Sequence, residues 1–304
     1  MEGYSVNKEA YTTEWFKNRA LNSITPLQPG VWDYSDSLLL YIPGSDESYQ
    51  SIQEVENPYH EMVAGPEEAY LKSIAEAVAT DLPQHFEYID LGPGTAHKEQ
   101  YLFDALKAQG KTFEYRPVDI SKRFLSLASD HAKRQGIPVQ PLNASFEELS
   151  ERLGTPTHPR FVSIGLTYSN YNPTYVLTLL KQIAGENGSA FINSQLRERI
   201  DIDRLASVYA SEAVGMVEGK LKLLNLGSDE IAAMRTDTGI RTWCSLKSVT
   251  DALADKGVRA GDEFLIFQSL RPTKESLESD VTAVFPNAVF HDTGSSFIGT
   301  HLRP

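Results

Sequence analysis

A glycine-rich stretch at residues 88–96 could bind a ligand through its backbone. Its sequence is Tyr-Ile-Asp-Leu-Gly-Pro-Gly-Thr-Ala, so a short apolar run passes into a Gly-x-Gly turn. Glycine at such a turn lets the main chain approach a ligand where a Cβ atom would clash. Gly92 and Gly94 are therefore candidate binding residues, together with Thr95. Asp90 either contacts an amino group of the ligand or braces the turn.

The sequence around this turn disfavours the common phosphate-bearing nucleotides. A dinucleotide fingerprint has a third glycine in the spacing G-x-G-x-x-G, and this chain has His97 at that position. The chain also contains no G-x-x-x-x-G-K-[ST] loop, which disfavours ATP and GTP. The candidate ligand is therefore a nucleoside without a phosphate chain.

An acidic residue ends the next predicted strand. Asp119 follows Arg116-Pro117-Val118, one strand–helix unit after the glycine turn. A carboxylate at that place can hold the diol of a ribose. Asp119 could instead cap the following helix, with Ser121 as the other candidate cap. Because the glycine turn and the acidic residue occur together, the sequence predicts binding of S-adenosylmethionine (SAM).

The next two predicted strands also end in residues suited to a nucleoside site. The exit of the third strand is expected to meet the adenine and comprises Asn143, Ala144, Ser145 and Phe146. The fourth strand leads into residues 165–171, where Tyr168 is a further candidate for binding SAM. Four consecutive strand ends thus present candidate ligand groups at one edge of a sheet.

The residues predicted to act at the reaction centre are polar or aromatic. The candidates for positioning an acceptor are Tyr171, Asn170, Ser194 and Trp32. Aromatic faces stabilise a sulfonium or ammonium ion by about 0.5–2 kcal/mol each. The aromatic candidates are Trp32, Tyr34, Tyr41, Tyr59, Tyr168 and Tyr171. Any one of them could equally be an ordinary core or rim aromatic.

The elements that must position these residues alternate between strands and helices from His85 onward. Strands are predicted at 86–91, 113–118, 139–142, 161–166 and 189–194. Helices are predicted at 98–109, 122–135, 146–153 and 174–184. This alternation predicts an α/β fold with a doubly wound, mostly parallel sheet.

The flanking regions are predicted to complete the sheet and to cover it. Residues 1–80 are expected to form an N-terminal cap region, with helices at 8–21 and 66–80. Residues 81–198 are expected to form the SAM-binding core, and 199–258 a helical cap insertion that is helical from 201 to 256. Residues 259–304 are expected to complete the core sheet, with a strand at 263–267, a helix at 275–285 and a hairpin through Gly294 within 291–302.

The composition limits the partners of the chain. Its 304 residues include 28 Lys and Arg against 41 Asp and Glu, a net charge of −13, and no basic stripe. Nucleic acid and anionic membrane are therefore disfavoured as partners, and a small-molecule substrate is expected. No apolar span or secretory signal is apparent, so a cytoplasmic protein is expected. Cys244 is the single cysteine and belongs to no Cys/His cluster, so no metal is expected. The oligomeric state is left open.

Three segments resemble a known family. They are Asp-Leu-Gly-Pro-Gly-Thr at 90–95, Pro-Val-Asp-Ile-Ser at 117–121 and Gly-Leu-Thr-Tyr-Ser-Asn-Tyr-Asn-Pro at 165–173. These segments resemble motifs of the ergothioneine-pathway histidine Nα-methyltransferases. The resemblance covers about 58–194. It implies a Rossmann-like class I methyltransferase fold, a seven-stranded sheet with a substrate cap, and SAM held by Gly92, Asp119 and the exit at 143–146.

The chain departs from this family at the substrate. The histidine-binding Glu and Ser of the family occur within a Thr-Glu-x-Ser sequence late in the cap. The nearest stretches here, 235–238 and 241–245, do not match it. Histidine is therefore not carried over as the substrate.

Three hypotheses for function remain. The first is methyl transfer to the nitrogen of a small amino acid or amine, in which the protein mainly aligns the reactants. The second is cyclisation of SAM to azetidine-2-carboxylate with release of methylthioadenosine, as in the azetidine-2-carboxylate synthases that resemble the same family. The third is a non-catalytic nucleoside-binding protein, which the intact glycine turn and Asp119 disfavour.

Overall fold

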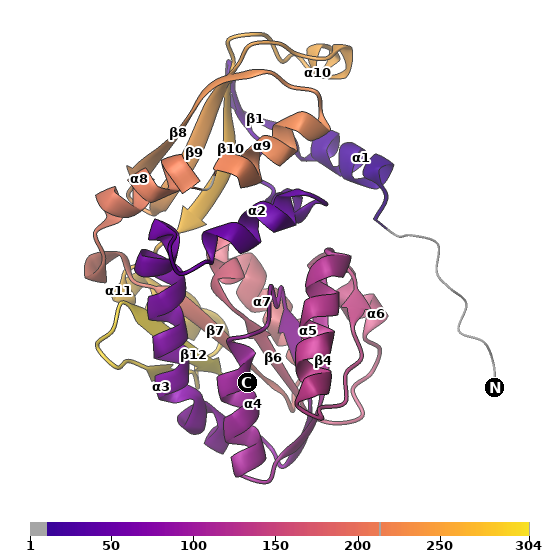
Figure 1. The fold of residues 1–304 in the computed structure, drawn as a ribbon, viewed down its shortest axis with the longest axis vertical. Helices are drawn as coiled ribbons and strands as arrows, with labels where there is room; N and C mark the ends of the chain where they lie inside the picture. The colour runs from indigo at the N-terminus through magenta and orange to yellow at the C-terminus, as the bar shows by residue number, and fades with distance from the viewer. Residues whose placement is uncertain (1–10, 213, 304) are drawn as a thin grey trace, which may run out of the picture.

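The computed structural model describes residues 11–212 and 214–303. It contains two sheets, one of seven strands and one of five. In Figure 1 the seven-stranded sheet and its helices form the lower part of the molecule, and the five-stranded sheet with its own helices forms the upper part. We call these two parts the core and the cap.

The first strand of the core sheet in chain order, β3, lies at its centre, and later strands are added on both sides. Its order is β11-β12-β7-β6-β3-β4-β5. β3 (His85–Leu91) pairs in parallel with β4 (Thr112–Asp119) and with β6 (Arg160–Ile164). β5 (Leu142–Asn143) and β7 (Ser189–Gln195) extend the parallel part on the two sides. β12 (Phe297–Leu302) is antiparallel to β7, and β11 (Val289–His291) is antiparallel to β12.

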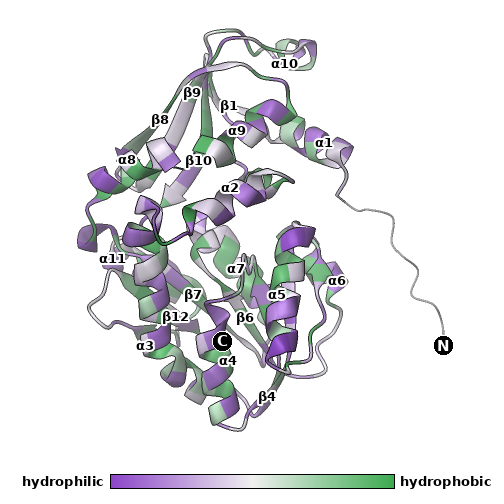
Figure 2. Ribbon diagram, in the orientation of Figure 1, coloured by the Kyte–Doolittle hydropathy of each residue, from purple (hydrophilic) through white to green (hydrophobic). Residues whose placement is uncertain are grey.

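Helices cover both faces of this sheet, because its strands carry apolar side chains on both faces. Phe86 and Tyr88 belong to a core cluster shared with α3 (Gly65–Asp81), α4 (Glu99–Ala108) and α5 (Lys122–Arg134). Ile89 and Leu91 belong to the cluster of α7 (Pro173–Ala184) and α11 (Lys274–Val284). The short helix α6 (Leu149–Arg152) contributes to this second cluster. Hydrophilic and hydrophobic residues alternate along α5 in Figure 2, as a helix with one buried face requires.

The cap combines residues from both halves of the chain. Its sheet has the order β1-β2-β10-β9-β8. β1 (Thr25–Gln28) and β2 (Val31–Asp33) come from the N-terminal region, and β2 is parallel to β10 (Glu263–Leu270). β8 (Ser228–Thr236) and β9 (Gly239–Leu246) form an antiparallel hairpin beside β10. The cap helices are α1 (Thr13–Ser23), α2 (Ser45–Ile52), α8 (Ile202–Glu212), α9 (Val214–Leu223) and α10 (Asp251–Asp255).

Five short helical segments join these elements. They are η1 (Ser37–Tyr41), η2 (His60–Ala64), η3 (Phe146–Glu148), η4 (Leu166–Asn170) and η5 (Arg197–Arg199). η2 is a π-helix turn that runs directly into α3. No helix in 11–212 or 214–303 has the length and apolarity to cross a membrane.

The predicted class I methyltransferase topology is confirmed, and so are most of the predicted core elements. The hairpin through Gly294 is also confirmed, with Gly294 at a φ of 81° between β11 and β12. The predicted helix at 8–21 is observed from Thr13, and residues 8–10 lie outside the described residues. The division of the chain at 80, 198 and 258 stays a prediction.

Two predictions about the cap were wrong. Residues 201–256 were expected to be mostly helical, but β8 and β9 occupy 228–246. In β9 the side chains of Thr242, Cys244 and Leu246 are buried and alternate with half-buried neighbours, a period of two that specifies a strand. β10 was expected to complete the core sheet, yet it pairs with β2 and β9 in the cap. Only β11 and β12 complete the core sheet from the C-terminal region.

Candidate functional site

The candidate site lies where the order of the core sheet reverses, between the carboxyl ends of β3 and β6. Open α/β sheets bind ligands at such switch points. Three cavities lie here beneath the cap. We call them the central, deep and cap cavities and define each by its residues below.

The central cavity has about 470 Å³ of empty space. Its lining comes from the ends of β3, β4 and β5 and from the segments that lie over them. The lining residues are Leu38, Tyr41, Tyr49, Gly92, Gly94, Asp119, Ile120, Phe124, Ala144, Ser145, Phe146, Thr167 and Tyr171.

The turn after β3 requires glycine at this cavity. Gly92 has a φ of 70° and Gly94 a φ of 56°, both in the left-handed region. A Cβ atom on Gly92 would lie 3.1 Å from Oγ1 of Thr167. The main chain is therefore bare at the place where it faces the cavity.

Asp119 supplies a buried carboxylate to the same cavity. Its side chain is only 6% exposed, and one of its oxygens accepts a 2.8 Å hydrogen bond from the backbone N–H of Ser121. Ser121 itself caps α5 by accepting from the N–H of Phe124 at 3.3 Å. Burial, reinforced by the charges of Asp46 and Asp90, raises the pKa of Asp119 to about 7. The helix cap is thus Ser121, and Asp119 faces the cavity.

Residues that follow β5 line the central cavity, and Asn143 at the end of β5 fixes the neighbouring loop. Ala144, Ser145 and Phe146 line the cavity. Asn143 does not; its amide donates to the carbonyl oxygens of Asp119 and Ile120, each at 2.9 Å. Asn143 was predicted to contact the ligand, and this stays a prediction; in the structure its amide nitrogen fixes the loop that carries Asp119.

The deep cavity adjoins the glycine turn and carries both signs of charge. Asp90 lines it and accepts hydrogen bonds from the hydroxyls of Tyr115 and Ser163, each at 2.7 Å. The carboxylate of Glu67, on α3, accepts from Nδ2 of Asn193 at 2.7 Å and from Nζ of Lys98. Thr95 also lines this cavity. With Glu99, the cavity has three carboxyl groups and one ammonium group beside a glycine turn, and such groups can hold the two charged ends of an amino acid.

Burial alters the titration of the acids in this region. It raises the pKa of Asp90 above the usual range of a carboxyl group, although the hydrogen bonds from Tyr115 and Ser163 oppose the shift. Burial, together with the charge of Asp90, also raises the pKa of Glu99 to about 8. A bound cation in the deep cavity would favour the ionised form of both groups.

The cap cavity lies between the core and the cap. It shares Tyr41, Tyr49 and Thr167 with the central cavity, so the two adjoin. Its remaining residues come from α2, η4, α8, α9, β10 and the loops beside them. They are Ile52, Tyr59, Leu166, Asn170, Tyr209, Met216, Phe267, Ser269 and Arg271.

Most of the predicted site residues are brought together at these cavities. The residues that line at least one cavity are Asp90, Gly92, Gly94, Thr95, Asp119, Ala144, Ser145, Phe146, Asn170 and Tyr171. Asn170 and Tyr171 also line an open groove between α1 and α7.

Trp32, Ser194 and Tyr168 line none of the three cavities. The indole N–H of Trp32, in the cap sheet, donates to Asp262 at 2.8 Å. Ser194 is fully buried on β7, and its neighbour Asn193 faces the deep cavity instead, because side chains alternate along a strand. Tyr168 packs in the core cluster of α7. The structure thus places these three residues away from the cavities, and their roles stay predictions.

Several cavity residues were missed by the sequence analysis. Lys98 follows the glycine turn at the start of α4, so its position could have indicated it. Glu67, Thr167 and Asn193 carry no local motif. Arg271 belongs to a cap whose fold was mispredicted.

A doubly wound seven-stranded sheet with antiparallel final strands, a Gly-x-Gly turn after its first strand and a carboxylate ending the second define the class I methyltransferase fold. Residues 37–214 match the family described as histidine-specific methyltransferase, SAM-dependent. This match covers more than half of the chain. The chain therefore belongs to that family, whose cosubstrate is SAM.

Individual relatives are more distant. The histidine N-alpha-methyltransferase of Mycobacterium tuberculosis is 28% identical over 99 residues, which span 32% of this chain and 31% of that protein. A SAM-dependent methyltransferase structure from Clostridium acetobutylicum is 13% identical with a TM-score of 0.47, over 85% of this chain and 98% of that one. A structure from Pyrococcus horikoshii is 14% identical with a TM-score of 0.48, over 85% and 97%. At these identities neither structure bears on the reaction or the substrate.

Proposed function

We propose that this protein transfers the methyl group of SAM to the nitrogen of a small amino acid or amine. The observation that carries the proposal is the junction of two cavities at Tyr41, Tyr49 and Thr167. One cavity has the residues expected for an adenosine, and the other offers separate space for an acceptor.

The described residues fit SAM. The bare backbone at Gly92 and Gly94 and the carboxylate of Asp119 suit a nucleoside whose ribose hydroxyls donate to that carboxylate. In the deep cavity, Glu67 and Asp90 suit the ammonium group of the methionine part, and Lys98 suits its carboxylate. When bound, SAM supplies an electrophilic methyl group on a sulfonium centre.

Aromatic residues and positioning groups supply the rest of the proposed mechanism. Burial raises the pKa of Tyr41 and of Tyr59 above the usual range of a phenol, so both stay neutral and can donate hydrogen bonds. Their ring faces can stabilise a cationic centre by about 0.5–2 kcal/mol each. Asn170 lines the cap cavity, Tyr171 lines the central cavity, and both line the open groove, so they are placed to orient an acceptor.

No Asp, Glu or His lines the cap cavity among the residues that the structure describes. An amine attacks only through its lone pair, and no described carboxylate or imidazole of this cavity would take up its proton, so the acceptor enters as the neutral amine and its proton leaves to solvent after transfer. Catalysis would rest on alignment of the reactants rather than on a general base. The excess of acidic over basic residues supports a small-molecule acceptor rather than a nucleic acid.

The test is product analysis by mass spectrometry. The protein is incubated with SAM alone and with SAM plus a pool of the twenty amino acids. Histidine is also tested singly, because one relative is a histidine N-alpha-methyltransferase. We expect S-adenosylhomocysteine only when an acceptor is present. Consumption of SAM to methylthioadenosine without any acceptor would contradict methyl transfer.

Cyclisation of SAM is the second candidate function, and the same absence of an acidic residue favours it. An external amine would find no anionic partner among the described residues of the cap cavity. In this reaction the α-amine of SAM attacks its own γ-carbon, the bond from that carbon to sulfur breaks, and methylthioadenosine leaves as a proton is released. The SAM-only incubation would then yield azetidine-2-carboxylate.

A further inference from the structure

Arg271 places a buried positive charge at the cap cavity. It follows the last residue of β10, is 1% exposed and lines the cavity. No ion pair joins it to a carboxylate of the described residues. A buried cation without a counter-ion is costly to keep unless something else neutralises it.

Neutral groups hold the guanidinium in a fixed orientation. Nε donates to Oε1 of Gln195 at 3.0 Å, and Nη2 donates to the hydroxyl of Tyr209 at 3.2 Å. Nη1 donates to Oγ of Ser269 at 2.7 Å and to the carbonyl oxygen of Leu270 at 2.9 Å. Gln195 is itself fixed, because its amide donates to the carbonyl of residue 62 at 2.8 Å. These bonds use four of the five guanidinium N–H groups and leave one on Nη2.

The chain treats another buried guanidinium differently. Arg160 is 6% exposed, and its Nε lies 2.9 Å from Oε2 of Glu87. There the counter-charge is built into the fold. At Arg271 no described carboxylate supplies a counter-charge, although the residue lines a cavity.

We propose that Arg271 binds the carboxylate of the acceptor, which makes the acceptor an amino acid with a free carboxyl group rather than a simple amine. This inference rests on the proposed methyl transfer. The donors that would receive the carboxylate are the free N–H of Nη2 and one hydroxyl of the Ser269–Tyr209 pair, because the other hydroxyl donates within that pair. Charge-assisted hydrogen bonds of this kind are among the strongest in proteins.

SAM also carries a carboxylate, and the positions of the two cations distinguish the two sources. Lys98 lines the deep cavity beside the glycine turn, and Arg271 lines only the cap cavity among the three. The carboxylate of SAM is therefore assigned to Lys98 and that of the acceptor to Arg271.

The test compares acids with amides in the wild-type protein, so it needs no variant to fold. One pool contains the twenty proteinogenic L-amino acids and the other their α-amides at equal concentrations, each with saturating SAM. We expect S-adenosylhomocysteine to form at least about tenfold more slowly from the amides. The amine of an amide is less basic and more often neutral, so protonation cannot explain a slower reaction.

The outcomes separate the two proposals. Equal rates from acids and amides would overturn the role of Arg271 and leave methyl transfer standing. Formation of S-adenosylhomocysteine from neither pool would overturn methyl transfer and the inference with it.

Variants give a second readout. Arg271→Gln should raise the KM of the acceptor about tenfold or more and bring the acid-to-amide ratio close to one, with the Kd of SAM by calorimetry within about twofold of wild type. A matching loss of SAM affinity would instead assign Arg271 to the carboxylate of SAM. Arg160→Gln is the matched control, because it removes a buried arginine whose partner is Glu87. It should lower thermal stability without changing the acid-to-amide ratio.

Discussion

Asp119 shows how one residue can couple nucleoside binding to pH. Its carboxylate is buried, and its pKa is raised to about 7. Ribose hydroxyls donate best to the ionised form. SAM binding should therefore be tighter above pH 7 and weaker below it, the direction expected for a ligand that prefers the deprotonated group.

We expect the Kd of SAM, measured by calorimetry, to rise at least about tenfold between pH 8 and pH 6, because the ionised fraction of Asp119 alone falls by about that factor. Asp119→Asn should weaken binding and flatten this dependence, leaving the part that comes from Glu99. Asp280→Asn is the control, because burial also raises the pKa of Asp280 but it lines none of the three cavities. A wild-type Kd that does not change between pH 6 and 8 would contradict this role of Asp119.

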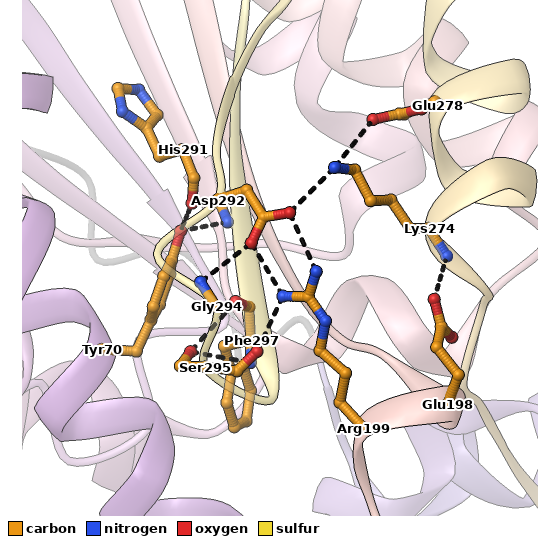
Figure 3. Close-up of polar contacts among 11 residues, drawn as sticks. Tyr70, Glu198, Arg199, Lys274, Glu278, His291, Asp292, Gly294, Ser295 and Phe297 are labelled. Atoms are coloured by element: carbon orange, nitrogen blue, oxygen red, sulfur yellow. Dashed lines mark hydrogen bonds and ion pairs between the residues drawn. The ribbon is translucent and has the colours of Figure 1, made fainter.

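At the scale of elements, the C-terminal hairpin is tied to the rest of the core through Asp292. Figure 3 shows the carboxylate of Asp292 between Arg199 and Lys274, with the N–H of Gly294 donating to it. The Arg199 contacts are 2.7 and 2.9 Å and the Lys274 contact is 2.9 Å. The hydroxyl of Tyr70, on α3, donates to the carbonyl oxygen of His291 at 2.5 Å. These contacts hold β11 and β12 at the edge of the sheet.

Asp292→Asn should lower the free energy of unfolding by about 1 kcal/mol at pH 7, the upper end for a partly exposed ion pair. Hydrogen bonds from Arg199 and Lys274 hold the pKa of Asp292 well below its usual range. A carboxyl group whose pKa is lowered by folding stabilises the fold at pH values above its unfolded pKa. This stabilisation is lost as the pH falls, so the difference in unfolding free energy between the variant and wild type should shrink toward pH 3. Asp203→Asn, in an exposed pair with Arg235, should have no measurable effect. Identical urea unfolding of Asp292→Asn and wild type at pH 7 would sink the prediction.

The predictability of the elements followed the strength of their local signals. The core strands and helices were predictable because apolar period and turn residues agree, as at β3 and α5. β8 and β9 were missed because residues such as Ala and Leu suggested helix, whereas the pairing of β8 with β9 and of β9 with β10 decides their structure. The placement of Gly92 and Asp119 at a cavity was predictable from motifs. The placement of Arg271 was not, because it depends on contacts with residues 60 or more positions away.

At the scale of the whole molecule, the site lies at the junction of core and cap. The cap takes β1 and β2 from the start of the chain and β8, β9 and β10 from its later part, as the colours of Figure 1 show. Arg19 on α1 links the two parts, with Nε 2.6 Å from Asp36 and Nη2 2.9 Å from Glu147 beside the central cavity. Such a cap can enclose an acceptor over the glycine turn, which the proposed alignment mechanism requires.

The central claim is that SAM binds where the bare backbone at Gly92 faces the central cavity. Calorimetric titration of SAM into wild type, Gly92→Val and Gly110→Val tests it most directly. Gly110 also has a φ of 70°, but a Cβ atom there would meet nothing within 4 Å, so this variant carries the same backbone strain away from the cavity. We predict one SAM per chain for wild type and Gly110→Val and no measurable binding for Gly92→Val. Wild-type affinity in Gly92→Val would contradict the account.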